Sequence, residues 1–175
     1  LFSIVSHPEM LEKSYYTHRT IKRANTRGLD DVNQFDGRSI DDFIAISKTL
    51  KAGTYVFAPM QKMSTPKSGK RAARPIGTTP QDMVVHTSVK IVLQAIYEPE
   101  FSLQDWNYGF RPNRSCNNAL QQVKVRGKGM TQVIEGDLKG AYEMVNHDKL
   151  IQIISRRTTD KKFLRLIKKI LQTGI

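Results

Sequence analysis

Apolar residues recur at helical spacing along most of this chain, and turn-forming residues separate the periodic segments. Helices are predicted at Pro8–Ala24, Ser39–Gly53 and Pro80–Tyr97, from Ser115 to about Gly127, from Asn146 or His147 through Ile154, and from an N-cap at Asp160 onward. Pro99 is expected to end the third helix, because proline removes a backbone donor.

The last predicted helix has two different faces. Its apolar stripe consists of Phe163, Leu166, Ile167, Ile170 and Leu171, and its basic face of Lys161, Lys162, Arg165, Lys168 and Lys169. A run of charges on a helix is more often a solvated face than a dedicated RNA contact, and the pattern alone leaves both readings open.

Three shorter segments have the composition of strands. Tyr55–Met63 and Arg71–Ile76 are expected to pair, since Thr65–Lys70 between them contains the residues of a hairpin turn. A further strand through Val133 and Ile134 is expected to end at Asp137.

Asp137 is a candidate metal ligand, because a strand end holds a side chain rigidly. Gly136 leaves the neighbouring backbone uncrowded, Gly140 permits a sharp turn, and Tyr142 follows five residues after the carboxylate. Hard cations such as Mg²⁺ take carboxylate oxygens as ligands. An Asp after a strand more commonly caps a turn or the next helix, so the spacing alone does not decide between these roles.

The composition points to a polyanionic partner. The 175 residues suffice for one domain, or for one domain and part of another, and carry 28 Lys and Arg against 16 Asp and Glu. The net charge of +12 favours nucleic acid as the partner, because cations that neutralise phosphates release counterions. No apolar run is long enough for a membrane span, and the single cysteine, Cys116, indicates a reducing compartment.

Three separated segments resemble, in the same order, the reverse transcriptases and maturases that group II introns encode. The first is Pro66–Gly77, in which Pro-Lys and Gly-Lys precede Arg-Pro-Ile-Gly, and the approach to it at Gly53–Tyr55 also fits. The second is Ile96–Phe101 with Tyr108–Ser115, whose Tyr-Gly-Phe-Arg-Pro sequence is the most specific signal in the chain. The third is Gly136–Leu150 around Asp137.

This resemblance implies an α+β fold of the right-hand polymerase type, with helix-rich fingers, a basic β-hairpin and the first catalytic strand of the palm. The corresponding division is a basic N-terminal extension over residues 1–38, fingers over 39–114 and the start of the palm over 115–175. The implied function is that of an RNA-directed DNA polymerase that binds group II intron RNA and assists splicing and intron mobility. The alternatives are an RNA-binding maturase without polymerase activity, or a basic globular protein with chance similarity.

The resemblance also assigns roles to matching positions. Asp137 and the carbonyl of Leu138 would bind Mg²⁺ in a two-metal site that residues outside this chain complete. The implied nucleotide contacts are Lys67, Arg74, Ala141 and Tyr142, with Tyr142 as the gate against a ribose 2′-hydroxyl. Candidate nucleic-acid contacts are Arg19, Lys22, Arg23, Lys70, Arg71, Arg111 and Arg114.

Several of these assignments have alternatives. Arg111 can instead brace its loop, and Lys70 and Arg71 can lie on a solvated turn. Tyr108 and Phe110 are expected to be buried rather than to stack on bases. Tyr142–Glu143 also departs from the family's common Phe-Asp, and Thr78–Pro80 departs from its Ile/Val-Pro-Thr.

The sequence stops at Ile175, before the family's Tyr-Ala-Asp-Asp turn, so these 175 residues alone are expected to lack polymerase activity. The implied partners are intron RNA, template RNA, a DNA primer, a deoxynucleoside triphosphate and the rest of the palm and thumb, with no membrane. The expected compartment is the mitochondrion, with the plastid and the bacterial cytoplasm as alternatives.

Overall fold

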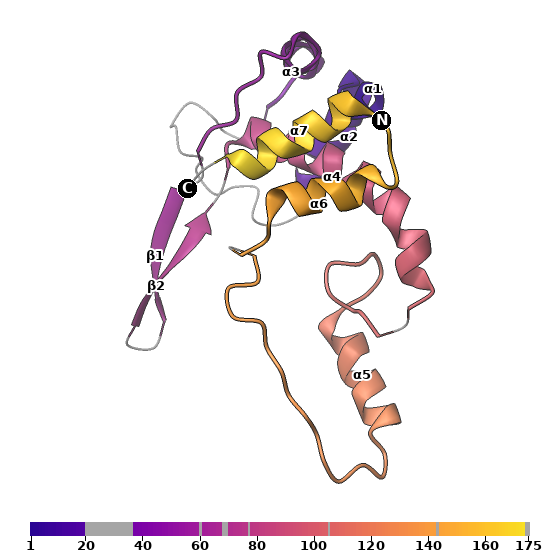
Figure 1. Cartoon of the computed structure of the whole chain (residues 1–175). Helices are drawn as coiled ribbons and strands as arrows, with labels where there is room; N and C mark the ends of the chain where they lie inside the picture. The colour runs from indigo at the N-terminus through magenta and orange to yellow at the C-terminus, as the bar shows by residue number, and fades with distance from the viewer. Residues whose placement is uncertain are drawn as a thin grey trace. The chain divides into compact units, whose positions relative to one another are not determined.

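The computed structural model describes residues 1–19, 37–59, 61–67, 70–76, 78–104, 106–142 and 144–173. Its elements, in chain order, are α1 (Phe2–Val5), α2 (Pro8–Arg19), α3 (Ile40–Ala52), β1 (Gln61–Lys67), β2 (Lys70–Ile76), α4 (Pro80–Ser102), α5 (Cys116–Arg126), α6 (His147–Ser155) and α7 (Lys161–Gln172) (Figure 1). They divide into two compact units, and the boundary falls inside α4. Unit 1 is Leu1–Val92 with His147–Ile175, and unit 2 is Leu93–Asn146.

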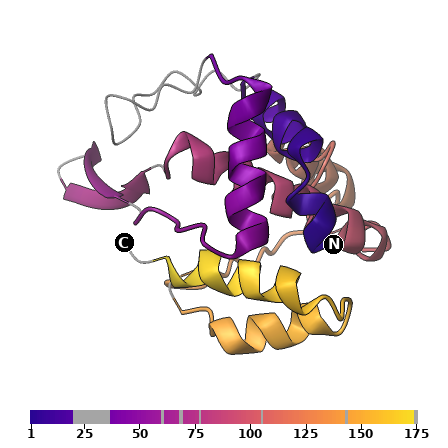
Figure 2. The same ribbon diagram turned by 90° about the horizontal axis from the view of Figure 1, so that it is seen from above.

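The hydrophobic core of the described residues lies in unit 1. There α1 packs on α2, α2 on α3, and α6 on α7, and the last pair lies side by side in Figure 2. The buried apolar side chains are Val5, Leu11, Tyr15, Phe43, Ile46, Leu50, Val84, Val85, Val89, Val92, Ile154, Phe163, Leu166 and Ile167. Full burial of one such side chain contributes about 1.5–3 kcal/mol, so this cluster stabilises unit 1 and fixes the positions of its helices.

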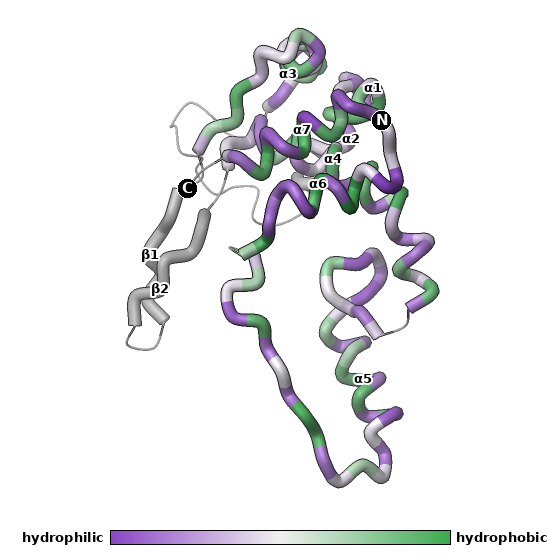
Figure 3. The backbone as a smooth tube through the Cα atoms, viewed as in Figure 1, coloured by the Kyte–Doolittle hydropathy of each residue, from purple (hydrophilic) through white to green (hydrophobic). Residues whose placement is uncertain are grey.

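The helix ends follow the capping residues that the sequence shows. The Ser39 N–H donates to Asp42 Oδ2 at 2.8 Å, and Gly53 ends α3 in the left-handed region with φ of 76°. At α7, Asp160 Oδ1 accepts the N–H groups of Lys162 and Phe163. Figure 3 shows hydrophilic and hydrophobic residues alternating along α7. All six predicted helices are present, with α2 described as far as Arg19.

One helix is longer than predicted, because α4 continues through Pro99 to Ser102. The proline removes a single backbone donor, whose acceptor in a regular helix would be the carbonyl of Ala95. Ala95 is exposed, so water can take the place of the missing donor. A proline this close to the end of a helix therefore costs less than one in its interior.

The predicted hairpin forms, but its first strand begins later than expected. β1 and β2 are antiparallel, with Lys67 opposite Lys70 and Met63 opposite Arg74. The segment from Tyr55 to Pro59 is not a strand, because its polar groups bind the start of α4 instead. The Ala58 N–H donates to Asp82 Oδ2 at 3.0 Å, so it is unavailable to a ladder.

The predicted fold class, α+β of the right-hand polymerase type, was wrong. Helices dominate the described part of the chain, and β1–β2 is an isolated two-stranded ribbon that forms no sheet layer against a helix. The expected catalytic strand is also missing: residues 130–138 form neither helix nor strand, and Ile134 is 99% exposed. β-branched residues form a strand only where a neighbouring strand and a packing surface accept them, and no described segment offers either.

Candidate functional site

Asp137 lies on an exposed loop of unit 2 rather than at the end of a strand. The loop turns at Gly140, which has φ of 64° and whose carbonyl accepts the Met144 N–H at 3.0 Å. This confirms the predicted sharp turn. Leu138, Ala141 and Tyr142 lie on the same loop, and all three are exposed.

The described residues do not by themselves form the predicted magnesium site. They include no group of three or more His, Cys, Asp or Glu side chains placed to hold a metal ion. A two-metal site needs more carboxylate oxygens than Asp137 alone can offer. The exposed apolar side chains on this loop, among them Val133, Ile134 and Leu138, are typical of a surface that another segment covers.

Arg111 is the one buried residue in the described part of unit 2, with 8% of its surface exposed. Its Nη2 donates to Glu98 Oε1 at 2.6 Å, and its Nε donates to the same oxygen at 3.2 Å. Its Nη1 donates to the carbonyl oxygens of Gln104 and Asn107, both at 3.3 Å. The guanidinium therefore ties the end of α4 to the following loop, which favours the bracing role over an RNA contact.

The aromatic residues around Arg111 are arranged differently from the prediction. Tyr108 is half-buried, and Arg114 Cζ lies 5.0 Å from its ring centroid, at cation–π distance. Phe110 is 93% exposed and has φ of 56°, so its predicted burial was wrong. Arg111 takes the inward position in this tight turn, and its neighbour in sequence consequently faces solvent.

The predicted phosphate contacts of the hairpin occupy both strands. Lys67 is the last residue of β1, and Lys70, Arg71 and Arg74 belong to β2. These residues belong to unit 1 and Asp137 belongs to unit 2, so their assembly into one nucleotide site remains a prediction. Arg19 is the last residue of α2. Lys22 and Arg23 lie outside the described residues.

One buried carboxylate, that of Asp82, binds the segment that precedes the hairpin. Asp82 is 2% exposed, and its Oδ1 accepts the Tyr55 hydroxyl at 2.8 Å. Burial, followed by the charge of Asp82 and this hydrogen bond, raises the pKa of the Tyr55 phenol above its ordinary range. The Asp82 N–H donates to Thr79 Oγ1 at 3.2 Å, so the Thr79 side chain caps the start of α4. The Asp82 carboxylate instead binds Tyr55 and Ala58, in the segment before β1.

Similarity to known proteins extends over almost the whole chain, although no family model matches it. The chain is 35% identical over 175 residues to the group II intron-encoded protein LtrA of Lactococcus lactis subsp. cremoris, covering 99% of this chain and 29% of LtrA. It is 40% identical over 150 residues to an uncharacterized 91 kDa protein in the cob intron of Schizosaccharomyces pombe, covering 85% of this chain and 18% of that protein. The chain belongs to the group II intron-encoded proteins.

This group II intron-encoded chain also resembles a plant protein, the nuclear intron maturase 2, mitochondrial, of Arabidopsis thaliana. The two are 29% identical over 126 residues, which cover 69% of this chain and 17% of the maturase. The chain thus spans less than a third of the length of each of these relatives. Relatives occur both in a bacterium and among proteins named as mitochondrial. Within the described residues, no helix has the length and apolar character that crossing a bilayer requires.

Proposed function

We propose that this chain is part of a group II intron-encoded RNA-directed DNA polymerase that binds intron RNA and assists splicing and intron mobility. The observation that carries this proposal is the similarity to LtrA over 99% of the chain. The net charge of +12 supports a nucleic-acid partner independently of that similarity. Template RNA, a DNA primer and a deoxynucleoside triphosphate are the substrates this proposal includes.

Within this proposal the predicted site residues keep their assigned roles. Asp137 contributes one carboxylate to a magnesium site, to which other parts of the whole protein also contribute. Lys67 and Arg74 neutralise the triphosphate, and Ala141 and Tyr142 border the sugar. Arg111 holds the loop of unit 2 in place, as its contacts with Glu98 support.

The second candidate is an RNA-binding maturase that assists splicing without polymerising. The similarity to a protein named as a nuclear intron maturase favours keeping it. The mitochondrion is the proposed compartment for either function, because that relative is named as mitochondrial. The plastid and the bacterial cytoplasm are the alternative compartments.

Primer extension and splicing by the whole protein separate the two candidates, and Asp137→Asn tests the role of the carboxylate. Primer extension should fall more than about a hundred-fold, because the carboxylate is an essential metal ligand, whereas splicing of the cognate intron should persist. Asp148→Asn is the matched control, since Asp148 is an exposed acid on α6 whose Oδ1 accepts from Lys168 Nζ at 2.9 Å. Splicing without primer extension by the wild-type protein would favour the maturase. Unchanged primer extension in Asp137→Asn would refute the role of Asp137 as a metal ligand, and equal loss of both activities would refute the division of roles.

A further inference from the structure

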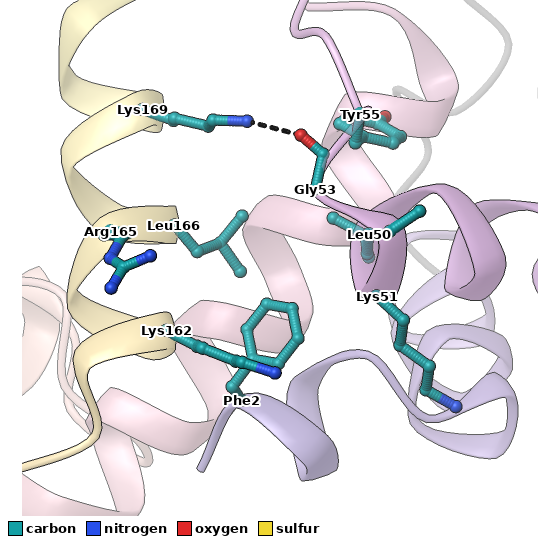
Figure 4. A pocket seen from close by; sticks show the side chains of 10 residues that line it. Phe2, Leu50, Lys51, Gly53, Tyr55, Lys162, Arg165, Leu166 and Lys169 are labelled. Atoms are coloured by element: carbon teal, nitrogen blue, oxygen red, sulfur yellow. Dashed lines mark hydrogen bonds between the residues drawn. The ribbon is translucent and has the colours of Figure 1, made fainter.

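A pocket of about 330 Å³ lies in unit 1, between α1, the end of α3 and α7 (Figure 4). Its apolar lining includes Phe2, Leu50 and Leu166, of which the two leucines are buried. Its polar lining is mainly cationic, from Lys51, Lys162, Arg165 and Lys169. None of its lining residues is acidic. The pocket therefore combines an apolar interior with positive charge.

The contacts of α7 separate its basic residues into two groups, which the sequence could not do. Lys162, Arg165 and Lys169 follow one another at spacings of three and four, so they share the side of the helix that borders the pocket. Lys168 instead forms an ion pair with Asp148, and Lys161 does not line the pocket.

The positive charge at the pocket is not neutralised by neighbouring acids. Lys169 Nζ donates to the Gly53 carbonyl at 3.0 Å, as the dashed line in Figure 4 marks, which holds this ammonium beside the end of α3. In the described part of the chain, no acidic side chain pairs with Lys51, Lys162 or Arg165. An anionic ligand would thus gain three uncompensated cations.

We propose that this pocket binds one unstacked nucleotide of single-stranded RNA. The base lies against Phe2 and the two leucines, and the flanking phosphates bind Lys51, Lys162 and Arg165. Proteins that hold single strands combine stacking on aromatic rings with cations along the backbone, and the volume is within the usual range for a small-ligand pocket, about 300–1,000 Å³. A free phosphate would use the cations and leave the apolar lining unoccupied.

This inference rests on the proposed RNA-binding function and assigns a specific site to it. The first test measures binding of the 175-residue chain to a fluorescein-labelled oligouridylate by anisotropy at increasing salt. Lys162→Gln with Arg165→Gln should reduce the slope of log affinity against log salt by about 1.4, since each phosphate contact on a single strand contributes about 0.7. Lys161→Gln with Lys168→Gln removes the same charge from the same helix outside the pocket, and should keep the wild-type slope.

The second test asks whether the pocket binds the base of the nucleotide as well as the phosphates. An abasic oligomer has the same phosphates, and the wild-type chain should bind it about ten-fold more weakly than the oligouridylate. Phe2→Ala should weaken oligouridylate binding by about the same factor and leave abasic binding unchanged. A circular dichroism spectrum equal to that of the wild type shows that the variant is folded.

The outcomes separate failure of the site from failure of the function. If the wild-type chain shows no salt-dependent RNA binding, the proposed function itself fails. If RNA binds but the two double variants behave alike, this pocket is not the site. Equal binding of normal and abasic oligomers, with a polyglutamate peptide bound in the same Lys162- and Arg165-dependent way, would assign the pocket to an acidic protein segment and overturn the proposal.

Discussion

Tyr55→Phe tests whether Asp82 anchors the segment that leads into the hairpin. The substitution removes the hydroxyl that donates to Asp82 Oδ1 at 2.8 Å and leaves the ring. A hydrogen bond to a charged group contributes about 1.5–3 kcal/mol, and Tyr55 is half-buried while Asp82 is 2% exposed. We therefore expect a loss of about 2 kcal/mol in the free energy of unfolding.

Asp82→Ala removes the acceptor for two donors, the Tyr55 hydroxyl and the Ala58 N–H. It should cost about 3–4 kcal/mol, because both donors lose their partner in a partly buried site. The double variant should lose about 2 kcal/mol less than the sum of the single losses, since the two residues share one interaction.

Urea unfolding of the 175-residue chain, followed by circular dichroism, measures these differences. Tyr16→Phe is the matched control, because Tyr16 is 51% exposed, and its effect should stay within about 0.5 kcal/mol. Additive losses in the double variant, or a Tyr55→Phe effect as small as that of the control, would refute the anchoring role.

Three further predictions concern the pH dependence of this contact and two other positions. The difference in the free energy of unfolding between the wild type and Tyr55→Phe should be constant below about pH 10 and decrease above it. The phenol pKa is raised on folding, so above pH 10 the phenol ionises more readily in the unfolded chain and the wild type loses stability. A difference that stays constant to pH 11.5 would contradict this. Glu98→Gln should destabilise the loop of unit 2 by about 3 kcal/mol, because it removes the charge partner of buried Arg111. Fluorescence of Trp106, the single tryptophan, measures this loss during unfolding. Glu135→Gln, at an exposed position, is the control and should have no effect. Gly53→Ala should lower the free energy of unfolding in urea by about 1–2 kcal/mol, because the φ of 76° at this position is unfavourable for a residue with a Cβ atom. Gly136→Ala is the control and should have no effect, since a Cβ atom there would meet no other atom within 4 Å.

The sequence predicts the helices of this chain well because their determinants are local. Ser39 with Asp42 marks the start of α3, and Asp160 marks the start of α7, each within one helical turn. The stretch at Val133 and Ile134 has strand composition as well, but a strand also depends on a distant partner, and composition does not reveal its absence. The family could be recognised from short motifs for the same local reason.

The parts of the site that the sequence did not predict depend on contacts between distant residues. Glu98 and Arg111 meet across 13 positions, so the sequence left the role of the arginine open between bracing and RNA contact. Asp82 binds Tyr55 across 27 positions. The basic face of α7 looks uniform in sequence, and only the neighbouring α1 and α3 distinguish the cations that line the pocket from the others.

The proposed function makes this chain an RNA-binding part of a group II intron-encoded protein. The most direct test is equilibrium binding of the cognate intron RNA by the 175-residue chain over a range of salt concentrations. Binding through at least three phosphate contacts predicts a linear fall of log affinity with log salt, with a slope of about −2 or steeper. An affinity that stays constant as salt rises, or equal affinity for a neutral polymer, would contradict it.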